Sequence, residues 1–163
     1  MTRRTQIDAR KFVALVLGAT LLAPIANASA ERAFAGLAGS WSGSGTISLA
    51  DGSKERLRCR GRYTVVGGKS QLAIDLRCAS DSYRVDLSSN LESRNGFISG
   101  MWSEASRGIS GSVSGKESGG TISALVEAPA FAATLTVSTR GNRQSFSIRS
   151  EGDIRNVSLS LTR

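Results

Sequence analysis

The residues best able to bind a ligand by charge form a row of cations in the middle of the chain. Basic residues occupy alternate positions from Lys54 to Arg62, so their side chains share one face of an extended strand. At roughly 6.7 Å per two residues, the row is about 27 Å long. Guanidinium groups bind phosphate and carboxylate in a bidentate manner, which makes the row a candidate docking strip for an anion. The candidate members are Lys54, Arg56, Arg58, Arg60, Arg62 and Arg77.

The same row has a simpler interpretation as a solvated strand face. Charged residues on an outer face discourage pairing with other chains at a sheet edge, and runs of charge usually serve solvation alone. If the row has a partner, we expect an anionic envelope component such as phospholipid headgroups, lipopolysaccharide phosphates or an acidic protein.

Composition removes the common catalytic and metal-binding constellations. The chain contains no histidine and two cysteines, which excludes Ser-His-Asp and Cys-His sets, the usual zinc sites and iron–sulfur clusters held by thiolates alone. Residues 111–116 fail as a phosphate loop because only three residues separate the two glycines. The carboxylates are scattered. We therefore expect a protein that is not an enzyme and that needs no cofactor or metal.

Three large aromatic residues are candidates for lining a ligand pocket. Trp41, Tyr63 and Trp102 could stack against a small apolar ligand. They could equally be the largest side chains of a sparse core, and we weigh this second interpretation more heavily because buried aromatic residues usually serve packing.

The first thirty residues predict a secretory signal peptide. Residues 1–11 are basic, residues 12–26 are mostly apolar, and Ala28-Ser29-Ala30 forms a small-x-small cleavage site. The apolar run is shorter than the roughly 20 residues that a spanning helix needs. We expect cleavage after Ala30, with Ala28 as the second choice, and the sequence leaves the Sec and twin-arginine routes open.

Export changes the charge and the redox environment of the chain. Residues 31–163 hold 17 basic and 12 acidic residues, so the net charge falls from +8 to +5. We expect a periplasmic or secreted protein, for which nucleic acid is a poor partner. Cys59 and Cys78 then lie in an oxidising compartment, where a disulfide is expected.

The exported part is predicted to be all-β and a single domain. Alternation of apolar and polar residues recurs with turn signals between the runs. About ten short strands follow a lead-in of residues 31–38, and they predict an antiparallel up-and-down meander over residues 39–163. The expected strands fall near residues 41–49, 57–65, 72–78, 83–87, 98–102, 109–113, 122–126, 131–137, 146–148 and 157–161.

Turn positions also predict register. A two-residue turn at Gly68-Lys69 places Cys59 opposite Cys78 and puts apolar partners on the cysteines' face. It also places Arg60 opposite Arg77 and Arg62 opposite Asp75. A three-residue loop at residues 51–53 predicts that Gly45 faces Cys59 and that Gly43 faces Gly61. Asn95-Gly96 is a further hairpin turn.

The positions predicted to face inward carry few large side chains. Many of them are Gly, Ala or Ser, too small to fill a wide barrel of ten strands. The sheet either encloses a cavity or flattens towards a sandwich, and the sequence leaves both open. A barrel that spans a membrane is not expected, because aromatic girdles are absent and the strands look shorter than about 9–11 residues.

The start of the first strand resembles a known signature. Gly39-Ser40-Trp41 is similar to the Gly-x-Trp sequence that opens lipocalin-like, or calycin, barrels. The chain is also similar to small exported alphaproteobacterial proteins of unassigned function. The calycin resemblance implies a tryptophan at the closed barrel end and a later structural arginine, which the sequence leaves unassigned. It also implies either a small ligand in the lumen or, as in barrels that inhibit proteases, an exposed N-terminal trunk at residues 31–38.

Overall fold

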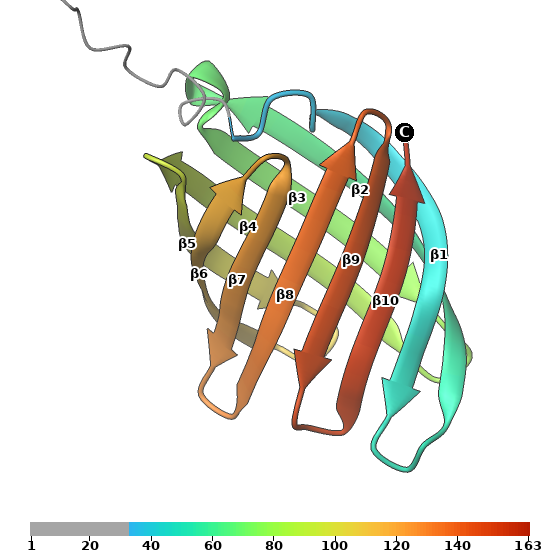
Figure 1. Ribbon diagram of the computed structural model, residues 1–163. Helices are drawn as coiled ribbons and strands as arrows, with labels where there is room; N and C mark the ends of the chain where they lie inside the picture. Colours follow the sequence, from blue (N-terminus) through green and yellow to red (C-terminus); the bar gives the residue numbers. More distant parts are fainter. Residues whose placement is uncertain (1–32) are drawn as a thin grey trace, which may run out of the picture.

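A computed structural model describes residues 33–163 as one closed β-barrel (Figure 1). The predicted signal peptide and residues 31–32 lie outside the described residues. Ten antiparallel strands each pair with their sequence neighbours, and β1 pairs with β10 to close the ring. The strands are β1 (Gly39–Leu49), β2 (Lys54–Val66), β3 (Gln71–Ala79), β4 (Arg84–Arg94), β5 (Phe97–Glu104), β6 (Ile109–Ser118), β7 (Thr121–Ala128), β8 (Phe131–Arg140), β9 (Arg143–Ser150) and β10 (Ile154–Thr162).

The prediction of an all-β up-and-down meander is therefore confirmed. The sheet closes into a barrel, which the sequence had left open. The strands have 8–13 residues and extend beyond the apolar runs from which the sequence predicted them. Most buried side chains of the strands are apolar, with exceptions such as the exposed Phe97 and Met101 and the buried Glu104 and Gln144. Among residues 33–163, no helix is long and apolar enough to cross a membrane.

The β2–β3 hairpin has the predicted register but a longer turn. Cys59 faces Cys78, and the two form the predicted disulfide. The strands end at Val66 and Gln71, so the loop has four residues rather than two. Three successive residues from Gly67 adopt left-handed φ values, and this widens the turn equally on both sides. The register is unchanged because the extra residues are added symmetrically.

The β1–β2 register differs from the prediction by two residues. Gly43, not Gly45, faces Cys59, and Trp41 faces Gly61. The loop is longer than residues 51–53, because the last strand pair is Ser48 with Lys54. A shift of two residues preserves the inward and outward faces. The Asn95-Gly96 turn is confirmed, since β4 ends at Arg94 and β5 begins at Phe97.

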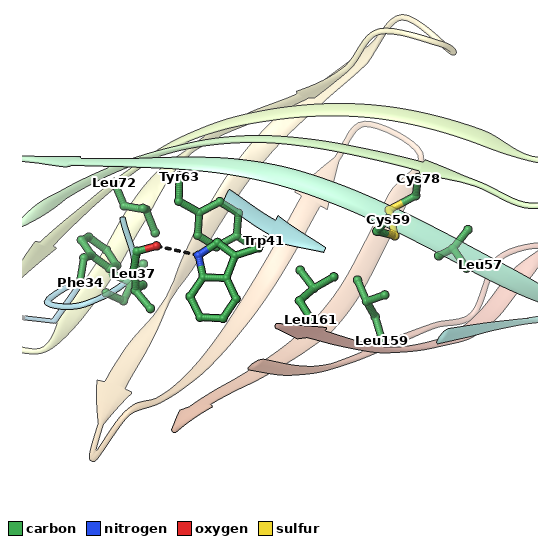
Figure 2. Packing of buried hydrophobic residues seen from close by; sticks show 11 residues of the cluster. Phe34, Leu37, Trp41, Leu57, Cys59, Tyr63, Leu72, Cys78, Leu159 and Leu161 are labelled. Carbon is green, nitrogen blue, oxygen red and sulfur yellow. Dashed lines mark hydrogen bonds between the residues drawn. A yellow bond between two sulfur atoms is a disulfide. The ribbon is translucent and has the colours of Figure 1, made fainter. Parts of the chain in front are cut away.

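Opposite walls of the barrel meet in a shared hydrophobic core. One cluster joins Trp41 and Leu161 with Ile98 of β5 and the half-buried Phe146 of β9. Figure 2 shows the tryptophan between residues of the lead-in, Tyr63 and the leucines of β10. A second cluster centres on Trp102 of β5. Contacts between facing walls fill this part of the interior.

At two glycines the backbone of the neighbouring strand leaves no room for a side chain. A Cβ atom at Gly43 of β1 would overlap the backbone carbonyl oxygen of Ser160 on β10. A Cβ atom at Gly111 of β6 would overlap the carbonyl oxygen of Glu127. Figure 1 places β1 and β6 at opposite edges of the barrel. Only glycine fits at these two positions without a shift of the neighbouring strand.

The lead-in closes one end of the barrel. Phe34 is fully buried, and the Trp41 Nε1–H group donates a hydrogen bond of 2.7 Å to the carbonyl oxygen of Leu37 (Figure 2). The Arg163 guanidinium lies 5.2 Å from the Trp41 ring and donates to the carbonyl oxygens of Gly36 and Ala38. Residues 33–38 thus lie against the barrel and do not extend from it, and Arg163 contacts both this segment and Trp41.

Candidate functional site

The predicted cation row lies on the outer face of β2. Its members, from Lys54 to Arg62, are all exposed, while the alternating Leu57, Cys59 and Tyr63 are buried. Across the strand pair, Arg62 faces Asp75 and Arg60 faces Arg77.

Four strands combine part of this row into an arginine groove. We define it by two rows of outward residues that cross from β1 to β4. One row is Ser42, Arg60, Arg77 and Asp86, and the other is Ser44, Arg58, Ala79 and Arg84. These residues line a single surface groove of about 1070 Å³. Cys59 and Cys78 also line the groove. Their disulfide links β2 covalently to β3.

The groove has a strong excess of positive charge. It is lined by four arginines and by one acidic residue, Asp86. The Arg77 Nε–H group donates a 3.3 Å hydrogen bond to the Oδ1 atom of Asp86. The Arg77 side chain is 81% exposed and the Asp86 side chain 46%. Exposed pairs of this kind contribute little stability. Within residues 33–163, Arg58, Arg60 and Arg84 form no salt bridge.

The sequence prediction and the groove overlap only in part. Arg58, Arg60 and Arg77 line the groove, whereas Lys54, Arg56 and Arg62 lie on the same strand outside it. Arg84 was missed. The signal that could have found it is the short turn after β3, which sets Ala79 opposite Arg84 and so brings a fourth arginine to the floor.

A buried carboxylate organises the loop beside the groove. Glu104 has an exposed side-chain fraction of 4%. Its oxygens accept hydrogen bonds from the backbone N–H groups of Asp86, Ser106 and Arg107 at 2.8–3.0 Å. Burial raises the pKa of Glu104, but these hydrogen bonds and the Arg107 side chain lower it more, so the pKa falls below its usual value. The carboxylate thus positions Ser106, which lines the groove.

We expect Glu104→Gln to destabilise the barrel by about 1–3 kcal/mol at neutral pH. The side-chain NH₂ group of glutamine would replace one carboxylate oxygen and would face backbone N–H groups that need an acceptor. The folded carboxylate has a lowered pKa. Its contribution is therefore present above the pKa of the unfolded chain and is lost as the pH falls through the folded pKa. The difference between variant and wild type should shrink in acid. Urea unfolding at several pH values measures it, and a difference that stays constant with pH would contradict the assignment.

The candidate ligand-lining aromatics do not converge on one site. Trp41 and Tyr63 pack together, with ring centroids 5.9 Å apart. Trp102 belongs to the second cluster and contacts Phe131 edge-on at 6.1 Å. All three are buried, and burial raises the pKa of the Tyr63 hydroxyl. None of them lines the arginine groove, so their role as ligand contacts stays a prediction.

A smaller groove of about 260 Å³ lies beside the lead-in. It is bordered by Gly36, Leu37, Ile122, Thr139 and Arg163 and carries little net charge. Among residues 33–163, no three His, Cys, Asp or Glu side chains gather as metal ligands.

Comparison with known proteins establishes the fold but no family. No protein-family profile matches the sequence, and no curated protein matches it significantly. The chain is similar to the crystal structure of Rv2717c from M. tuberculosis, with a TM-score of 0.66 and 19% identity over 83% of this chain and 98% of that one. It is also similar to the S-type phycobiliprotein lyase CPES from Guillardia theta, with a TM-score of 0.56 and 14% identity over 80% of this chain and 89% of that one. Both neighbours are ten-stranded barrels of the calycin-like kind.

Proposed function

We propose that this chain is an exported, non-enzymatic binding barrel whose arginine groove docks an anionic component of the cell envelope. The observation that carries the proposal is the groove itself, where four arginines share one lining acid. The predicted signal peptide supports export, and the Cys59–Cys78 disulfide is compatible with an oxidising compartment.

The direct pairing of Arg60 with Arg77 concentrates positive charge in the groove, although Arg140 faces Arg143 in the same way outside it. Like charges opposite each other on neighbouring strands destabilise a sheet. A bound anion would offset this repulsion, and in the groove Arg58 and Arg84 add two further cations beside the pair. Guanidinium groups also match phosphate and carboxylate geometry.

Vesicle binding tests the proposal. We expect the chain without its leader to bind vesicles that contain anionic phospholipid and not neutral vesicles. Binding should weaken as salt rises from about 50 to 300 mM. An Arg58→Glu/Arg60→Glu/Arg84→Glu variant should bind at least about a hundredfold less, since each cation near an anionic surface contributes about 1 kcal/mol.

The matched control changes the same number of charges on another part of the barrel. Arg140→Glu/Arg143→Glu/Arg149→Glu alters exposed arginines of β8 and β9 and leaves the groove intact. We expect this variant to retain most of the binding. Equal loss in both variants would show that net charge, not the groove, attracts the vesicle. Absence of binding by the wild type at low salt would refute the proposal.

A further inference from the structure

We propose that the arginine groove is a shaped site for a terminal phosphate monoester carried by an envelope lipid, seated on Ala79 between Arg58 and Arg84. This inference rests on the proposed function and narrows its ligand. It starts from the strand register, which sets Arg58, Ala79 and Arg84 in one row across β2, β3 and β4.

Ala79 provides an exposed, shallow floor between two long cationic side chains. Adjacent strands lie about 4.8 Å apart, so the Cα atoms of Arg58 and Arg84 are roughly 10 Å apart. Charge-assisted N–H···O⁻ bonds are about 2.8 Å long. One phosphate above the Ala79 methyl group is therefore within reach of both guanidinium groups. A bulkier residue at this position would fill the space.

The charge of the site suits a dianion. Asp86 engages Arg77 by its 3.3 Å contact, and this leaves Arg58, Arg60 and Arg84 as the uncompensated cations of the groove. A phosphate monoester carries about −1.5 to −2 charges near neutral pH, whereas a phosphodiester carries only one. Three arginines around one small floor thus favour the monoester. The exposed Ser42 hydroxyl borders the groove beside Arg60 and can contact polar groups attached to the phosphate.

The surroundings of the groove favour a phosphate presented on a membrane surface over a free ion. Lys54, Arg56 and Arg62 continue the cation row of β2 beyond the groove on the same outer face. A free phosphate fits within the groove and makes no use of these flanking cations. An anionic lipid surface contacts the whole row, with one headgroup in the groove.

The test separates the shape of the site from its charge. Vesicles with phosphatidic acid, a monoester, are compared with phosphatidylglycerol vesicles, a diester, at equal surface charge. We expect tighter binding to phosphatidic acid and about a tenfold loss of that binding in Ala79→Leu, with phosphatidylglycerol binding unchanged. Ala73→Leu, on the same face of β3 outside the groove, is the matched control. Thermal unfolding confirms that both variants fold.

A second variant preserves the charge and removes the guanidinium geometry. Arg58→Lys/Arg84→Lys should lose the preference for phosphatidic acid, because an ammonium group is a point charge without a planar fork. Inorganic phosphate, added as a competitor at equal ionic strength, should displace the vesicles only weakly.

Each contrary outcome has a distinct meaning. Equal binding of both anionic vesicles, or unchanged phosphatidic acid binding by Ala79→Leu, would overturn the shaped site and leave anion docking intact. Full displacement by inorganic phosphate at matching affinity would assign the site to free phosphate and overturn the lipid source. Failure of both anionic vesicles to bind would refute the proposed function itself.

Discussion

Replacing Trp41 with alanine is expected to lower the free energy of unfolding by about 3–5 kcal/mol, the range for deleting a buried tryptophan. The side chain is 1% exposed and packs against Tyr63 and Arg163. Its loss would open the end of the barrel and release the Leu37 carbonyl oxygen from its hydrogen bond. Equilibrium unfolding in urea measures the change.

Two further variants divide this effect into its parts. Trp41→Phe keeps an apolar ring but removes the indole N–H, and should cost about 1 kcal/mol for the lost hydrogen bond plus a cavity contribution. Phe97→Ala is the matched control, because Phe97 is 58% exposed, and it should change stability by less than about 1 kcal/mol. A Trp41→Ala variant as stable as Phe97→Ala would show that the barrel end does not depend on the tryptophan.

Replacing Gly43 or Gly111 with alanine is expected to destabilise the barrel by about 3 kcal/mol or more. Their Cβ atoms would overlap backbone carbonyl oxygens of the adjacent strand, so the strands would have to separate. Overpacking alone costs about 1–3 kcal/mol, and each lost ladder hydrogen bond adds about 1 kcal/mol. Such a loss is a large fraction of the total stability of a domain.

Gly152→Ala is the control for this prediction. Gly152 does not adopt a positive φ, and a Cβ atom there would meet no heavy atom within 4 Å. We expect the variant to be neutral or slightly stabilised, because alanine reduces the conformational entropy of the unfolded chain. Thermal unfolding compares the three variants. Midpoints for Gly43→Ala and Gly111→Ala that match the control would mean that the neighbouring strands make room for a Cβ atom at little cost.

The sequence by itself determined the features that depend on neighbouring residues. Period-two alternation decides which face of a strand is buried, and it correctly placed the cation row outside and Leu57, Cys59 and Tyr63 inside. The pairing of Cys59 with Cys78 followed from the symmetry of one hairpin, and it held although the turn was longer than predicted. These results are local, because both cysteines lie on two adjacent strands whose connecting turn widened equally on both sides.

Only the tertiary structure decided where the strands end, how the ring closes and which residues of non-adjacent strands meet. The β1–β2 register could not be counted from the loop, since the number of loop residues left outside the ladder depends on where each strand ends. Arg163 meets Trp41 because β10 pairs with β1, which brings the last strand beside the first. Arg84 joins Arg58 across an intervening strand. The groove is therefore a property of four strands held side by side, and its floor at Ala79 is a methyl group that no charge pattern could mark.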